Sequence, residues 1–183
     1  MFNNDIHKIE PIVLKNVRIL SNHTNRDTGR ESHPRNFAGI GIPPYNAAGD
    51  RNFVIRLDPE VVDVEEMKAA GWNLKEGSPD PRNPEALPPY YLRVKVKYFP
   101  PDNSYSRMNP RIIKKAATAD LVVDEDNVAD LDRDDIDYAN MTIKGRWSDT
   151  PTYRGVTAYL SKMVVYLRED EDDLSYLMDD FRD

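Results

Sequence analysis

The sequence predicts a mainly β protein: a small barrel of five or six strands, with one or two short helices and long loops. Two observations favour this fold. Short segments rich in Val, Ile, Leu and aromatic residues recur along the chain, and one of them alternates cleanly between apolar and polar residues. Stretches rich in Pro, Gly and Asn separate these segments. A β-sandwich is the main alternative architecture.

The expected strands follow in order along the chain. The first covers Ile12 to Leu20, and the second is the short apolar segment 52–57. The third, Tyr90 to Phe99, places Leu92, Val94, Val96 and Tyr98 on one face and Tyr91, Arg93, Lys95, Lys97 and Phe99 on the other. Further strands are expected at residues 111–115, 141–143 and 155–167.

Two short helices are expected between the strands. In the first, Asp58 is a candidate cap, Pro59 fits the first helical position, and Gly71 can end the helix. The second would start at a cap on Asp124 and run to about Leu131. Residues 21–35, 39–50 and 76–89 are polar or rich in Gly, Pro and Asn, and we expect long loops there.

The net charge of −7 is unevenly distributed along the chain. Residues 168–183 sum to −6 and residues 120–137 sum to −8, so the remainder of the chain sums to +7. Because charged partners respond to the local potential, screened over about 8–10 Å, an acidic average does not exclude a nucleic-acid partner.

Several functional classes find no support in the sequence. The chain has no Cys, which excludes disulfides and Cys-ligated metals, and no apolar run approaches the roughly 20 residues of a membrane span. The N-terminus lacks the pattern of a secretion signal, so we expect a soluble intracellular protein. Gly39 and Gly41 are not followed by the helix of a dinucleotide site, and we expect neither catalysis nor a cofactor. His7, His23 and His33 have no partner at metal-ligand spacing and are interpreted as surface residues.

The acidic run 120–137 is interpreted as a solvated acidic helix and turn. Metal binding is the alternative. A calcium loop starting at Asp130 would have Asp135 in place of the turn glycine and Met141 in place of the bidentate Glu, so no metal site is predicted. A carboxylate-dependent nuclease is a distant third hypothesis for the function.

Basic and aromatic residues form a more informative pattern. Lys and Arg follow phosphates, and exposed rings stack on bases. The alternative is that the basic strand face is merely solvated and that Trp72 and Trp147 belong to the core. The candidate nucleic-acid-binding residues are Arg35, Phe37, Arg51, Trp72, Lys75, Tyr91, Arg93, Lys95, Lys97, Phe99, Arg107, Arg111, Lys114, Lys115, Arg146, Trp147 and Tyr153.

Five short motifs occur in an order that resembles the bacteriophage single-stranded DNA-binding proteins. They are Asn-Phe-Ala-Gly at 36–39, Gly-Asp-Arg-Asn-Phe at 49–53, Gly-Trp-Asn-Leu-Lys at 71–75, Tyr-Leu-Arg-Val-Lys-Val at 91–96 and Gly-Val-Thr-Ala-Tyr-Leu at 155–160. The resemblance covers most of residues 12–167. It implies an OB-fold barrel without catalysis that binds single-stranded DNA, independently of sequence, in replication or recombination. The long segments 21–35 and 76–89 and the acidic run 120–137 depart from the family pattern.

The expected organisation is an OB-fold domain over residues 1–167 and a disordered acidic tail over 168–183. The tail is expected to recruit replication or recombination proteins. The sequence does not predict the oligomeric state of the protein. If the protein is encoded by a phage, it would act in the host cytoplasm. The alternative function is a β-barrel adaptor or structural phage protein that binds only protein. The tail residues expected to contact partners are Leu174, Leu177, Met178, Asp179, Asp180 and Phe181.

Overall fold

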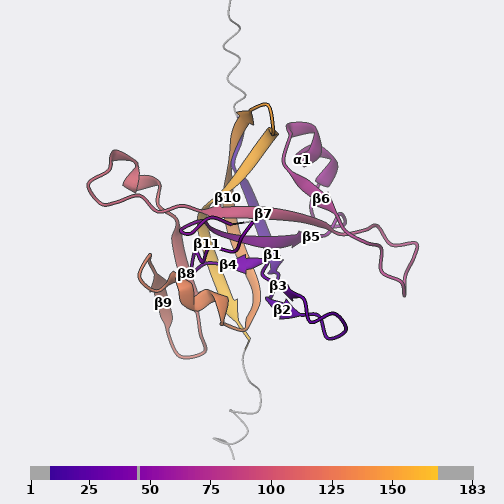
Figure 1. Ribbon diagram of the computed structural model, residues 1–183, viewed down its shortest axis with the longest axis horizontal. Helices are drawn as coiled ribbons and strands as arrows, with labels where there is room; N and C mark the ends of the chain where they lie inside the picture. The colour runs from indigo at the N-terminus through magenta and orange to yellow at the C-terminus, as the bar shows by residue number, and fades with distance from the viewer. Residues whose placement is uncertain (1–8, 45, 169–183) are drawn as a thin grey trace, which may run out of the picture.

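The computed structural model describes residues 9–44 and 46–168, and these form a β-barrel with one α-helix (Figure 1). The described residues contain little helix: α1 spans Val64–Ala70, and two 3-10 helices, η1 and η2, span Ser104–Met108 and Val128–Asp132. The strands are β1 (Ile12–Ile19), β2 (His23–Thr24), β3 (Glu31–Ser32), β4 (Arg35–Asn36), β5 (Arg51–Leu57), β6 (Leu74–Glu76), β7 (Tyr90–Val96), β8 (Arg111–Lys115), β9 (Asp120–Val123), β10 (Ile136–Asp149) and β11 (Arg154–Leu167).

Five of these strands close the barrel. β1 pairs with β5 and β10, β5 pairs with β7, and β10 pairs with β11, all antiparallel. The ring closes where β7 and β11 run parallel, with Val94 opposite Ala158 and Lys95 opposite Tyr159. This is the five-stranded Greek-key order of an OB-fold, and it confirms the predicted fold class.

The barrel interior is filled by the alternate residues of each strand. Phe53, Ile55 and Leu57 of β5 are fully buried, and the opposite residues of β7 are buried as well. Phe37 stacks on Phe53 with ring centroids 4.9 Å apart. Because side chains alternate across a strand, the intervening residues of β5 and β7 point outward, and this exposes one face for binding.

The predicted start of the first helix needs correction. α1 begins at Val64, where the Asp63 carboxylate accepts a hydrogen bond from Glu66 N, and it ends at Gly71 as predicted. Asp58 instead closes a turn, since its carbonyl accepts from both Val61 N and Val62 N. Gly71 has φ 95°, and a Cβ there would lie 2.8 Å from the Trp147 ring, so both conformation and packing favour glycine.

The acidic run 120–137 differs from the predicted helix and turn. Its first residues form strand β9 on the outside of β8, and its only helical element is the 3-10 helix η2. Asp124 closes the turn before η2 by accepting hydrogen bonds from Asp126 N and Asn127 N. The expected strand at 141–143 is the centre of β10, which extends over 14 residues.

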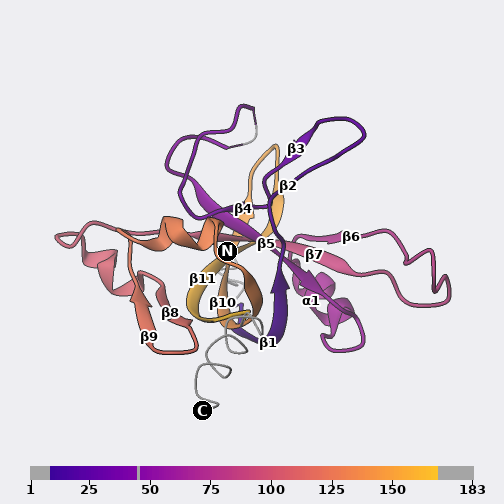
Figure 2. The same cartoon turned by 90° about the horizontal axis from the view of Figure 1, so that it is seen from below.

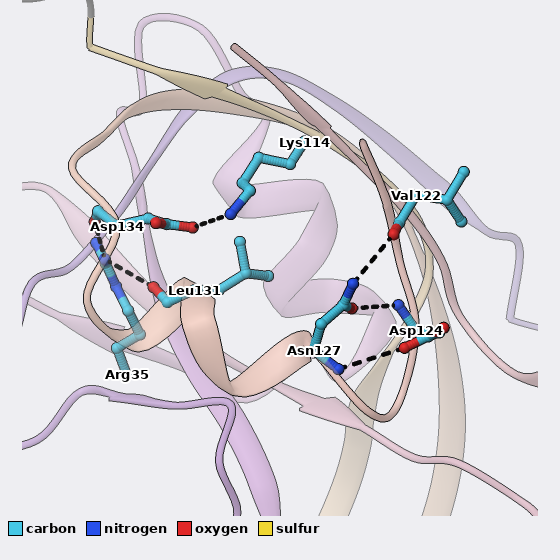
Figure 3. Close-up of polar contacts among 7 residues, drawn as sticks. All are labelled: Arg35, Lys114, Val122, Asp124, Asn127, Leu131 and Asp134. Atoms are coloured by element: carbon cyan, nitrogen blue, oxygen red, sulfur yellow. Dashed lines mark hydrogen bonds and ion pairs between the residues drawn. The ribbon is translucent and has the colours of Figure 1, made fainter. Parts of the chain in front are cut away.

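Buried polar contacts attach η2 to the segment that leads from β4 into the next loop (Figure 3). The Arg35 guanidinium donates to the carbonyls of Leu131 and Asp134 at 3.1 and 2.9 Å. The two carboxylate oxygens of Asp132 accept hydrogen bonds from Phe37 N and Ala38 N at 2.7 and 2.9 Å. These contacts position the chain where it enters the loop 39–50.

Candidate nucleic-acid interface

A basic groove lies on the outer face of the barrel, over the start of β5 at Arg51 and the end of β7 at Val96. It encloses about 500 Å³. Asp50 is the only acidic residue of the described chain that lines it. Its basic side chains are Arg51, Lys75, Arg93, Lys95 and Lys97, and two rings, Tyr98 and Tyr159, complete the polar lining with Asn46 and Asn52.

Strand register explains why these side chains share one face. Asn52 of β5 lies opposite Lys95 of β7, Lys95 lies opposite Tyr159 of β11, and Tyr159 lies opposite Lys144 of β10. Directly paired residues point to the same side of a sheet. The outer face of the barrel therefore carries a row of residues that crosses four strands. In this row the Tyr159 ring has Lys95 on one side and Lys144 on the other.

Arg93 is held in place by a chain of side-chain amides. Its guanidinium donates to Asn52 Oδ1 at 3.0 Å, and Asn52 Nδ2 donates to Asn46 Oδ1 at 3.0 Å. Asn52 is buried, and Asn46 belongs to the loop 39–50. The loop and the basic strand face are thus connected by hydrogen bonds, so that Arg93 has a defined direction.

At the other end of the groove Arg51 and Tyr98 pack together. The Arg51 guanidinium lies 5.5 Å from the Tyr98 ring centroid and 3.5 Å from Glu125 Oε1. The Tyr98 hydroxyl is buried and makes no hydrogen bond within the described part of the chain. Burial raises the pKa of Tyr98 to about 12; Arg51 opposes this shift, while Glu125 and Asp124 add to it. Tyr98 is therefore uncharged at neutral pH.

A second hollow of about 510 Å³ continues under the β2–β3 hairpin. Arg93 and Asn46 line both hollows, so the two adjoin. His23, Arg30 and His33 contribute to the second hollow, and His33 Nε2 lies 3.1 Å from the Glu31 carboxylate. The first half of the long loop between β1 and β5 therefore extends the surface next to the basic groove.

The structure gathers part of the predicted set in this region. Arg51, Lys75, Arg93, Lys95 and Lys97 line the groove. Tyr91 lies opposite both Arg56 and Lys75 and extends the same face toward the other end of β7. Arg146 lies one outward position beyond Lys144 on β10, opposite Thr157.

Three predicted residues are interior and need correction. Arg35 is 3% exposed, and its guanidinium donates to backbone carbonyls. Burial lowers the pKa of Arg35, and the nearby carboxylates of Asp132, Asp134 and Asp135 oppose this shift. Phe37 is fully buried against Phe53, and Trp72 is 5% exposed within the core. Since these side chains present almost no surface to a ligand, we leave them out of the interface.

The other predicted residues lie outside the groove. Lys114 pairs with Asp134 at 2.9 Å and Lys115 with Asp120 at 3.3 Å, both on the β8 side of the barrel. The rings of Phe99 and Tyr105 of η1 are tilted with centroids 5.6 Å apart, and Lys97 Nζ lies 5.1 Å from the Phe99 ring centroid. Of the remaining four residues, Arg107 belongs to η1 and Arg111 begins β8. Trp147 lies near the end of β10, opposite Val156, and Tyr153 lies in the turn between β10 and β11.

Sequence reasoning missed Tyr159 and Lys144. Tyr159 lies between the apolar residues Ala158 and Leu160 of the expected strand 155–167, and the structure buries both neighbours and turns Tyr159 outward. That alternation was the available signal. Lys144 could be placed only by knowing that it pairs with Tyr159.

No group of three or more potential metal-ligating side chains occurs within residues 9–44 and 46–168. In the same part of the chain, none of the helices has the length and apolar character needed to cross a bilayer. The tail residues from Glu169 to Asp183, including the predicted partner contacts, lie outside the described residues.

Comparison with known proteins identifies the family. A family model for a putative phage ssDNA-binding domain matches residues 8–180. The chain belongs to this family. No curated protein matches it.

Solved structures of one phage protein are similar to this member of the family. The single-stranded DNA-binding protein of bacteriophage Enc34 is 10% identical and covers 87% of this chain and 82% of its own, with a TM-score of 0.47. Its C-terminal truncation is 11% identical, covers 87% of both chains and has a TM-score of 0.46. The same protein in complex with ssDNA is 11% identical, covers 87% of this chain and 88% of its own, and has a TM-score of 0.47.

Proposed function

We propose that the basic groove binds single-stranded DNA independently of sequence, and that the protein serves phage replication or recombination in the host cytoplasm without catalysing a reaction. The observation that carries this proposal is the row of Lys95, Tyr159 and Lys144 beside Arg93 and Lys97. Lysine and arginine contact phosphates of any nucleotide, and a tyrosine ring stacks on any base. Family membership supports the same ligand.

The fold supports this choice of surface. OB-folds bind oligonucleotides on the face of their second and third barrel strands, between the loops that follow the first and fourth strands. In this barrel those strands are β5 and β7, and the two loops are 20–50 and 150–153. The groove lies on that face and is bordered by residues 46 and 49–50 of the first loop.

A salt series tests the proposed ligand. Labelled oligo-dT and a duplex of equal length are titrated with the protein at several salt concentrations. Single-strand preference and a negative slope of log affinity against log salt are expected. Affinity for neither nucleic acid would support the adaptor that binds only protein, and magnesium-dependent cleavage would support a nuclease.

We further propose that residues 168–183 compete with DNA and recruit replication or recombination proteins. Eight carboxylates in this segment repel DNA, but a tethered anionic segment reaches a nearby cationic groove at high effective concentration. Its apolar residues Leu174, Leu177, Met178 and Phe181 offer contacts to a protein partner. Truncation after Leu167 should raise affinity for oligo-dT, most clearly at low salt, and should abolish capture of partner proteins. Unchanged affinity and capture would reduce the segment to a solubilising appendage.

A further inference from the structure

A larger groove, separate from the two hollows described above, lies between β1 and α1. It encloses about 1130 Å³, and α1 runs beside β1 in the view of Figure 2. Val13 and Val61 line it and are 64% and 76% exposed, and Ile12 and Val62 line it as half-buried side chains. A groove that exposes several apolar side chains on a DNA-binding domain marks a surface for another ligand.

The groove exists because β5 ends close to the point where it pairs with β1, and so it leaves most of β1 uncovered. β5 pairs with β1 only at Arg18 and Ile19 and ends at Leu57. Pro59 follows, has no backbone N–H to donate, and the chain turns away into α1. Over residues 12–17, β1 pairs with β10 on one side, and no strand of the described chain pairs with its other side.

Within residues 9–44 and 46–168, this part of β1 therefore has a free edge beside an apolar groove. Unpaired backbone groups at a strand edge are a template for one more strand, which supplies main-chain hydrogen bonds while alternate side chains enter pockets. The free edge stops at Asn16, where a bulge and φ of 54° interrupt the register with β10. An added strand would match the segment 12–15.

The charges around the groove select the occupant. Glu10, Asp63 and Glu66 line it, against Lys15 as its one basic residue among those described. An acidic rim repels DNA and the chain's own acidic tail, and it attracts cationic side chains. The basic DNA groove lies at the opposite end of β5, and the two grooves share no lining residue.

We propose that this groove docks an extended peptide of a partner protein, with alternating apolar and basic side chains, as an added strand on the edge of β1. The apolar side chains face Val13, Val61 and Val62, and the basic side chains reach the Asp63 and Glu66 carboxylates. This interaction is separate from the proposed DNA binding. The protein would hold DNA and the peptide at the same time.

Fluorescence anisotropy with three labelled heptapeptides tests the proposal on the full chain without DNA. One peptide alternates lysine and valine, the second has glutamate in place of lysine, and the third has serine in place of valine. The lysine–valine peptide should bind at least about tenfold more tightly than either comparator, because only it satisfies both the apolar groove and the acidic rim. Equal affinity for all three, or tighter binding of a peptide with the sequence of residues 169–183, would overturn the proposal.

Two variants locate the site. Val13→Lys places a charge at the free edge and Glu66→Lys reverses a charge of the rim, and each should weaken the lysine–valine peptide about tenfold or more. Val122→Lys and Glu85→Lys are matched controls, since both residues are exposed and neither lines the groove. Equal effects of variants and controls would contradict the assignment.

Hydrogen exchange supplies the backbone readout. Peptide binding should protect amides within residues 12–16, whereas protection confined to α1 would exclude strand addition. Saturating oligo-dT should leave the peptide affinity unchanged. Competition between the two ligands would contradict separate sites.

Discussion

Replacing Arg93, Lys95 and Lys97 together with glutamine should weaken binding to oligo-dT and flatten its dependence on salt. All three side chains are exposed on the outer face of β7, whereas Leu92, Val94 and Val96 between them are buried. The substitutions remove three positive charges from the groove and leave the core unchanged. The fold should therefore survive, with a modest cost where Arg93 no longer donates to Asn52.

The magnitude follows from the number of phosphate contacts. Five exposed basic side chains line the groove or belong to the row beside it: Lys75, Arg93, Lys95, Lys97 and Lys144. Each contact contributes about −0.7 to the slope of log affinity against log salt on single strands, so the wild-type slope should be about −3.5. Between 50 and 200 mM salt the wild type should lose about 130-fold in affinity, and the triple variant, with a slope of about −1.4, only about sevenfold.

Anisotropy titrations of labelled oligo-dT at four salt concentrations measure both slopes. A control that changes Lys15, Arg82 and Arg133 to glutamine loses the same charge at exposed positions outside the groove. It should keep the wild-type slope. If the β7 variant and this control gave the same slope, the interaction would depend on net charge alone and the groove would not be the site.

Three other perturbations test the described geometry. In a Trp147→Phe background, oligo-dT should leave the fluorescence of Trp72 unchanged, and Trp72→Ala should cost about 3–5 kcal/mol in urea unfolding, because the indole is 5% exposed. The wild type should lose stability between about pH 10 and pH 12, and Tyr98→Phe should abolish this loss. Burial raises the pKa of the Tyr98 phenol in the folded state, so its contribution to stability is present below the unfolded pKa and is lost as the pH passes the folded pKa. Asp132→Ala should lower the free energy of unfolding by about 2–3 kcal/mol through loss of two hydrogen bonds to backbone amides, whereas Asp130→Ala, at an exposed position, should change it little.

Strand periodicity in the sequence was sufficient to predict the barrel. The alternation at 90–99 identified both the buried and the exposed face of β7, and the β-branched segments located β1, β5, β8 and β11. Strand β9 escaped prediction because the acidic residues around Leu121 and Val122 dominated the interpretation of that run. Its pairing with β8 depends on a partner strand, which local composition does not reveal.

The site was predictable only where residue type and side-chain direction could both be inferred. On β7 the alternation supplied the direction, and Arg93, Lys95 and Lys97 all face the groove. Arg35 and Phe37 lie in a polar segment that resembles an exposed loop. However, Arg35 donates to carbonyls more than 90 residues away in the sequence, and Phe37 stacks on the buried ring of Phe53. Charge and aromaticity in a loop identify candidates, and tertiary contacts decide which of them reach solvent.

The acidic run 120–137 acquires a different role from the solvated face that its composition indicates. Glu125 approaches Arg51, Asp134 binds Lys114, and Asp132 binds the backbone amides of Phe37 and Ala38. These carboxylates are directed toward cations and amide groups of the barrel, so part of their charge is balanced locally. Such contacts allow a domain with a basic groove to include a strongly acidic segment, and they fix the loop 39–50, whose residues 46 and 49–50 border that groove. The most acidic segment of the described chain thus helps to shape the surface that we assign to DNA.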